Sequence, residues 1–228
     1  MKSVTSLLKT VWAQLYFTAV LLKIGGLKVF LKQFLHQIYS NSSQVSFTLD
    51  LQDAEIPQVE AKIKYSLQIA SKQDMDEIMQ KAKSESKDMA QKLVYRRWLY
   101  EDGYRNCYIA RTADTNEMCF IQFIIYPQDD KIVNGRFKSW FPKLKEDEAF
   151  LEGTYTFEKF RGNRLHPSVT TDQLKICKEQ GFKRVVAYTE KKNEASLKGA
   201  ERAGFKPIGE VPERKILFFT KRRFNRVN

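Results

Sequence analysis

Metal-ligating side chains are scarce in this chain of 228 residues. Its two histidines exclude a histidine-rich metal site, and its odd number of cysteines (Cys107, Cys119 and Cys177) shows no metal-ligand spacing. Cys119 and Cys177 lie in apolar patterns, so we expect them to be reduced core residues of a cytosolic protein. A serine-hydrolase elbow, a P-loop and tandem repeats are also missing, which excludes the classes of protein that depend on them.

Long apolar runs are missing as well. Residues 10–22 carry no charge, but this run is shorter than the roughly 20 residues that span a bilayer. Residues 27–39 are amphipathic, with lysines on one face and large apolar side chains on the other. We therefore expect residues 1–40 to be a helical extension that lies in a membrane interface. Packing on the body, packing in a homodimer, and a cleaved or spanning segment are the alternatives.

Positive charge is abundant and unevenly placed. The net charge is +12, and no acidic residue precedes Asp50. Such basicity suits anionic lipid, nucleic acid or phosphorylated ligands, and it does not choose among them. The hydrophobic share of 43% and the aromatic share of 13% argue against disorder. The polar residues 41–60 predict a linker, and residues 61–228 predict one folded domain.

Hydrophobic periodicity and turn residues divide the domain into strands and helices. A capped helix follows the first predicted strand, and glycines close several of the later helices. The order predicts an α/β fold with a mixed sheet flanked by helices. The expected strands are 65–69, 106–111, 118–126, 149–157, 183–189 and 216–220, and the expected helices are 71–83, 88–100, 167–180 and 193–203.

One loop carries the clearest chemical signal. The strand that ends at Phe157 is followed by Arg161-Gly162-Asn163-Arg164-Leu165-His166 and then by a helix with Pro167 in its first turn. Backbone N–H groups at a helix start, together with the helix dipole, form a site for a pyrophosphate. Glycine allows a close approach of the backbone, and the arginines add charge unless they are only solvated surface residues.

A second motif follows at Asn193 and Ser196, and Gly204-Phe205 closes its helix. Together with the loop motif, this order resembles the GCN5-related N-acetyltransferase superfamily over residues 61–220. The resemblance implies a GNAT-like mixed sheet, acetyl-CoA as cosubstrate, and an amine-bearing small molecule or sugar as acceptor. It also implies that Phe157, the loop residues and Asn193 contact the cofactor. A helix N-cap is the alternative role for Asn193.

Three positions depart from the pattern of that superfamily. Arg164 stands where glycine is usual, and His166 stands where glycine or alanine is usual. Ala200 occupies the position at which many relatives carry a tyrosine that protonates the leaving thiolate. A capping role in the loop is the alternative to catalysis for His166. These departures favour, as an alternative, a fold relative that has lost catalysis and serves as a binding or scaffold protein.

Glu152 is the candidate general base. It lies in an otherwise apolar and small stretch of the strand before the loop, where partial burial favours proton transfer near neutral pH. An ordinary outward-facing strand glutamate is the alternative. The expected activity is N-acetyl transfer from acetyl-CoA to an amine by direct attack. A longer-chain acyl donor is the rival, and a nucleic-acid role through the basic residues 221–226 is third.

Overall fold

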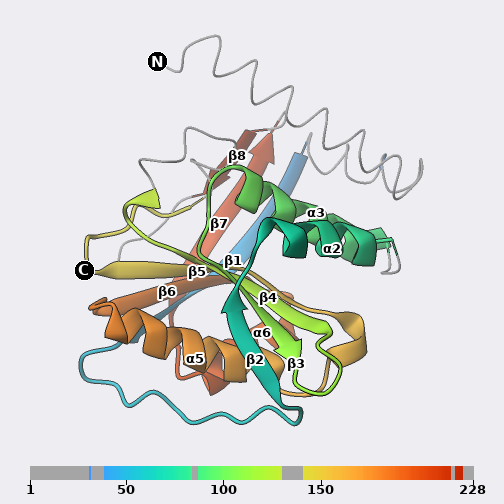
Figure 1. Cartoon of the computed structure of the whole chain (residues 1–228). Coiled ribbons are helices and arrows are strands. Elements are labelled where there is room, and N and C mark those ends of the chain that lie inside the picture. The colour runs from blue at the N-terminus through green and yellow to red at the C-terminus, as the bar shows by residue number, and fades with distance from the viewer. Residues whose placement is uncertain (1–30, 32–38, 84–86, 130–140, 217–218, 223–228) are drawn as a thin grey trace.

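A computed structural model describes residue 31 and residues 39–83, 87–129, 141–216 and 219–222. These residues form an eight-stranded mixed sheet in the order β2-β3-β4-β5-β6-β1-β7-β8 (Figure 1). Only the β5–β6 pair is parallel. The predicted α/β class with a mixed sheet is therefore confirmed. The helical extension predicted for residues 1–40 lies outside the described residues, apart from residues 31, 39 and 40.

The described strands are close to the predicted ones in the middle of the chain, and two long strands were missed. Their bounds are β1 Tyr39–Asp50, β2 Tyr65–Ile69, β3 Cys107–Thr112, β4 Met118–Ile125, β5 Glu148–Thr156, β6 Arg184–Glu190, β7 Lys206–Ile216 and β8 Phe219–Arg222.

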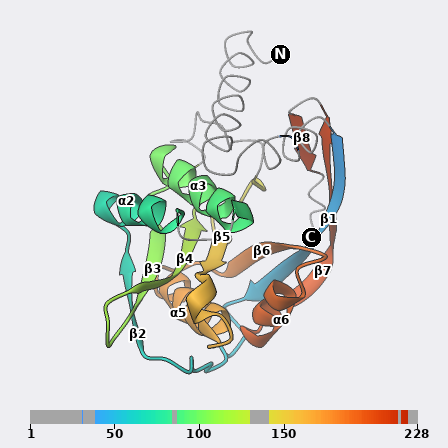
Figure 2. The ribbon, with the colours of Figure 1, turned by 90° about the vertical axis from the view of Figure 1, so that its right-hand side faces the viewer.

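Helices cover both faces of the sheet (Figure 2). One face carries α2 (Lys72–Lys81) and α3 (Lys87–Glu101), and the other carries α5 (Leu165–Glu179) and α6 (Glu194–Arg202). A short 3₁₀ helix, η1 (Glu158–Phe160), follows β5. The core forms two hydrophobic clusters. The larger one lies mainly beneath α2 and α3 and also includes Leu165 and Val169 of α5, and the smaller one packs against α5 and α6.

Residues 41–60, predicted as a linker, begin with most of strand β1. This strand pairs with β6 from Gln44 to Asp50 and with β7 from Tyr39 to Thr48. The linker prediction is therefore wrong for this part of the segment. Serines dominate its first half, and alternation appears only at Val45, Phe47 and Leu49, which face α5 and α6. Tertiary pairing on both sides overrides the weak local preference.

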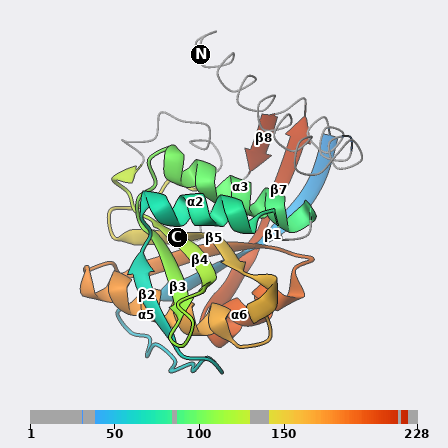
Figure 3. The same ribbon diagram turned by 45° about the vertical axis from the view of Figure 1, so that its right-hand side comes forward.

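The second missed strand, β7, contains Pro207 and Pro212, which usually exclude a central strand. Both prolines pair with β1, and β8 pairs with β7 only from Glu213 to Ile216. The far side of β7 thus has no partner strand at either proline among the described residues. Beyond the end of β6, β1 and β7 run on side by side (Figures 1 and 3).

Candidate functional site

The sheet opens between β5 and β6. Their parallel pairing runs from Glu148 and Arg184 to Leu151 and Ala187 and then stops, although β5 continues to Thr156 and β6 to Glu190. The facing edges of both strands beyond this point have no partner strand among the described residues. Because unpaired strand edges present free N–H and C=O groups, this opening can bind an extended chain that carries amides.

The loop after β5 leads to the start of α5. The backbone N–H groups of residues 162–166 donate to no described residue, and no side chain caps the helix. Gly162 has φ +79°, and a side chain there would meet nothing within 4 Å. Arg164 takes a left-handed conformation with φ +57°, which costs a non-glycine residue about 1–2 kcal/mol. Free N–H groups at a helix start, together with the helix dipole, can bind an anion.

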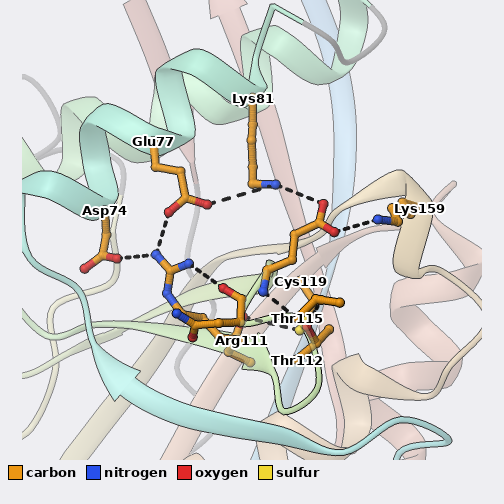
Figure 4. Close-up of polar contacts among 11 residues, drawn as sticks. Asp74, Glu77, Lys81, Arg111, Thr112, Thr115, Cys119 and Lys159 are labelled. Atoms are coloured by element: carbon orange, nitrogen blue, oxygen red, sulfur yellow. Dashed lines mark hydrogen bonds and ion pairs between the residues drawn. The ribbon is translucent and has the colours of Figure 1, made fainter.

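The base of this loop is held by side chains from other elements. Lys159 of η1 bonds Glu117 at 2.6 Å, and Lys81 of α2 bonds the same carboxylate at 3.1 Å (Figure 4). Hydrogen bonding by Lys159 and then by Lys81 lowers the pKa of Glu117. The backbone oxygen of Asn163 also accepts from the Lys62 N–H at 2.9 Å. The loop therefore has a fixed path at both of its ends.

The same network continues across α2 to the β3–β4 hairpin. Arg111 donates to Asp74 and to Glu77, each at 2.6 Å, and Glu77 lies 4.0 Å from Lys81 (Figure 4). The chain of alternating charges joins α2, the hairpin and η1, so we assign it to positioning of the loop and not to chemistry.

Arg161 lies away from the free N–H groups. Its guanidinium donates to the Thr156 carbonyl at 3.2 Å, to Glu158 at 3.4 Å and to the Met89 sulfur at 3.0 Å. It also lies 5.8 Å from the centre of the Tyr155 ring. To contact a pyrophosphate at the start of α5, this side chain has to change its rotamer. Arg164 is exposed, and no described residue accepts a hydrogen bond from its side chain.

Two residues predicted to contact the cofactor have buried side chains. Phe157 is 3% exposed, and Leu165 is 1% exposed. Both belong to the larger hydrophobic cluster, so only their backbone atoms remain for a ligand. Asn163 uses its amide to close the loop, through a bond to the Phe160 carbonyl at 3.1 Å.

His166 packs between two elements. Its ring stacks on Phe120 at 6.3 Å between centroids, and it occupies the space in which a side chain at Gly199 would lie, 2.2 Å from Nδ1. Glycine at position 199 of α6 is thus required by this ring. Burial lowers the pKa of His166 to about 4, so the imidazole is neutral at pH 7.

We expect His166 to make the fold sensitive to acid. The pKa is about 4 in the folded protein and about 6.5 in an unfolded chain, so below pH 6.5 the unfolded state takes up a proton that the folded state does not. Stability is therefore lost as the pH falls from about 6.5 to about 4. With a discount for the partial exposure of the ring, the loss between pH 7 and pH 5 is about 1–2 kcal/mol. Urea unfolding at both pH values should show a smaller loss for His166→Asn; an equal loss would contradict the assignment.

Asn193 is the N-cap of α6. Its Oδ1 accepts from the Ser196 N–H at 3.2 Å, and its Nδ2 donates to no described residue. The geometry is that of the capping role, and it leaves one donor group at the end of β6 for a ligand.

Glu152 lies on β5, one residue beyond the last β5–β6 pair. Its Oε1 accepts from the Tyr95 hydroxyl at 3.2 Å and from the Gly153 N–H at 2.8 Å. It is half-buried on the face covered by α3. The structure therefore places this carboxylate at the opening, with its orientation fixed by a hydroxyl and a backbone donor.

Arg96 is a candidate site residue that the sequence did not indicate. It is 6% exposed and donates to the carbonyls of Gly153 at 2.6 Å and Thr154 at 2.5 Å, and also to the carbonyl of Lys92. Burial lowers its pKa to about 10, which leaves it charged at pH 7. Its bonds hold β5 at an irregularity in the β4–β5 pairing, where Gly153 has φ +65°. No sequence signal separates it from its neighbour Arg97.

The described residues show neither a metal-binding cluster nor a membrane-spanning helix. Among the described residues, no group of three or more histidines, cysteines or acidic side chains is placed to hold a metal ion. No helix in the described part of the chain is both long enough and apolar enough to cross a bilayer.

Comparison with known proteins identifies the fold. No family model matches the chain, and no curated protein matches it. Among solved structures, the glucosamine N-acetyltransferase region of a fungal multi-domain β-N-acetylglucosaminidase is 15% identical with a TM-score of 0.57, over 82% of this chain and 22% of that one. A GCN5-related N-acetyltransferase from Sphaerobacter thermophilus is 10% identical with a TM-score of 0.53, over 85% and 57%. A GNAT-family acetyltransferase from Colwellia psychrerythraea is 14% identical with a TM-score of 0.51, over 82% and 61%.

The chain has the fold of the GCN5-related N-acetyltransferase superfamily. It spans between 22% and 61% of the length of these three structures. At this level of identity the likeness establishes the architecture, and the chemistry has to be argued from the side chains of this chain.

Proposed function

We propose that the protein is an N-acetyltransferase that moves an acetyl group from acetyl-CoA to an amine. The observation that carries the proposal is the row of free N–H groups at residues 162–166, beside the opening between β5 and β6. The N–H groups suit the pyrophosphate, and the unpaired strand edges suit the amides of the pantetheine arm. The GNAT-fold neighbours support the same donor.

Transfer then proceeds by direct attack in a ternary complex. Glu152 accepts a proton from the amine, the nitrogen attacks the thioester carbonyl carbon, and the C–N bond forms as the C–S bond breaks. The CoA thiolate leaves and takes up a proton. Ala200 cannot donate that proton, so a nearby tyrosine such as Tyr188 or Tyr155, or a water molecule, has to supply it. Arg96 acts at a distance, because it holds the strand on which Glu152 lies.

There are two alternatives to this proposal: one has a different acyl donor, and the other has no catalytic activity. A longer-chain acyl donor is favoured by the apolar residues of segment 1–40, and a non-catalytic binding protein is favoured by Arg164, His166 and Ala200. A thermal-shift series with acetyl-CoA, a long-chain acyl-CoA and free CoA separates these cases. Thiol release in the presence of amino sugars, amino acids and polyamines then tests turnover. If acetyl-CoA stabilises the protein but none of these amines causes release of the CoA thiol, the result would favour a non-catalytic binding protein.

The proposed setting is the cytoplasm, with residues 1–40 at an anionic membrane surface. The lysines of this segment and its apolar face are the support for this part of the proposal. Packing of the segment on the body or in a homodimer is the alternative, and a vesicle-flotation assay on the full chain distinguishes the two.

A further inference from the structure

A row of side chains crosses the sheet next to Glu152. Since Leu151 and Ala187 are the last β5–β6 pair, the next residues, Glu152 and Tyr188, lie on one face at the point where the strands separate. The β1–β6 register places Ser46 beside Tyr188. The ring of Tyr188 packs against the ring of Phe150, with 5.4 Å between the ring centroids, and both belong to the cluster that includes α2 and α3. The row therefore faces those helices.

Polar atoms without partners lie in this row. Ser46 is 3% exposed, and its Oγ forms no hydrogen bond to any described residue. The Oε1 atom of Gln44, two residues earlier on the same face of β1, is also buried and has no partner in the described part of the chain. Buried polar atoms are normally satisfied, so two such atoms on one face of β1, next to the strand that borders the opening, indicate a polar ligand.

The adjoining part of β7 leaves room for such a ligand. Gly209 pairs with Ser46, is exposed, and has φ +148°; a side chain built there would meet nothing within 4 Å. The β1–β7 register is also irregular between Ser46 and Phe47. Irregular pairing of this kind is frequent beside active sites, because it redirects side chains.

We propose that Ser46 and Gln44 of β1 bind the acceptor substrate, and that this substrate is a hydroxylated primary amine of the amino-sugar type. The proposal rests on the proposed acetyltransferase function. Ser46 lies two strands away from β5, at least about 10 Å between backbones, and Tyr188 of β6 lies between Glu152 and Ser46 in the row. One end of the acceptor thus meets the base while the other meets the neutral oxygens.

The neutral oxygens select hydroxyl groups. A hydroxyl both donates and accepts, so it satisfies Ser46 Oγ and donates to Gln44 Oε1. A purely aliphatic amine leaves both atoms unpaired. We therefore expect the protein to prefer an aminohexose over its unhydroxylated ring analogue.

The test compares glucosamine with cyclohexylamine and spermidine. Binding of each amine to the full-length protein is measured by calorimetry without a donor, and kcat/KM is measured with acetyl-CoA. Ser46→Ala should weaken glucosamine binding and lower its kcat/KM by about tenfold, the usual loss for one hydrogen bond, while cyclohexylamine is unaffected. Because the Ser46 hydroxyl has no partner among the described residues, the melting temperature of Ser46→Ala should not fall.

Ser43→Ala is the matched control. Ser43 lies on the opposite face of the same strand, where its hydroxyl donates to Glu210 at 2.8 Å, so this variant should keep the affinity of the parent for glucosamine. Gln44→Leu is the second variant, and it should reproduce the selective loss of glucosamine.

The possible outcomes are distinct. Equal affinity of the parent and both β1-row variants for glucosamine, no binding of glucosamine by the parent, or a preference for spermidine or cyclohexylamine would overturn the inference. Loss of acetyl-CoA binding in the parent, with glucosamine binding still dependent on Ser46, would overturn only the proposed acetyl transfer.

Discussion

Replacing Glu152 with glutamine is expected to lower turnover by about 10²-fold or more, which is the usual size of a general-base contribution. Glutamine keeps the shape of the side chain and can still accept from the Tyr95 hydroxyl and the Gly153 N–H. It cannot take the proton from the attacking amine. Steady-state kinetics should show that kcat/KM of the parent rises with pH through one ionisation and that the variant lacks this rise.

Glu148→Gln is the control on the same strand. Its carboxylate accepts from the Lys145 N–H and pairs with Arg184 at 3.4 Å, at the end of β5 that remains paired with β6. This variant should retain turnover. The affinity of either variant for acetyl-CoA should match that of the parent. Turnover of Glu152→Gln within twofold of the parent would assign Glu152 to structure.

Replacing Arg96 with methionine is expected to cost about 3–5 kcal/mol of unfolding free energy. Methionine fills most of the volume and leaves the carbonyls of Gly153 and Thr154 buried without their donor. The strand that presents Glu152 should then lose its fixed conformation. Turnover should therefore fall even at temperatures at which the variant is fully folded, as urea titration and circular dichroism can establish.

Arg97→Met is the control for Arg96→Met, because it also removes an arginine from α3 but leaves the buried contacts of Arg96 intact. Arg97 pairs with Asp76 and Glu101 on the surface, where ion pairs contribute about 0–1 kcal/mol. Arg96→Lys is a milder variant for kinetic work, because it keeps the charge and loses the two-pronged contact. If Arg96→Met were as stable and as active as Arg97→Met, the buried guanidinium would have no positioning role.

The elements with strong local signals were the ones predicted correctly from the sequence. Ser71 caps α2 with a reciprocal capping box, Gly181 follows α5, and the strands from β2 to β6 alternate or run apolar. Strand β1 was not predicted, because its extended conformation depends on pairing with β6 and β7 and not on its serine-rich sequence. Strand β7 was not predicted because it contains two prolines, which usually exclude a central strand. The structure tolerates them because β8 does not pair with β7 at these positions.

In the candidate site, too, the sequence predicted the features that have a local signal and missed those that depend on tertiary contacts. The loop motif gave the position of the helix start, because glycine before a helix is a local signal. The partners of Arg161 and the buried bonds of Arg96 depend on α3 lying over β5, which no local pattern encodes. The unpaired oxygens of Ser46 and Gln44 belong to a strand that the sequence did not predict, so the proposed acceptor face could not be inferred from the sequence.

Calorimetric titration of acetyl-CoA into the parent protein, Gly162→Asp and Gly181→Asp tests the central claim most directly. Both glycines have positive φ, at +79° and +87°, and neither has an atom within 4 Å of an added Cβ, so the two substitutions impose the same backbone strain. Only Gly162 lies at the free N–H groups before α5, where a carboxylate would repel the pyrophosphate. The parent and Gly181→Asp should bind acetyl-CoA, and Gly162→Asp should not. Unchanged affinity of Gly162→Asp for acetyl-CoA would contradict the assignment of this loop as the cofactor site.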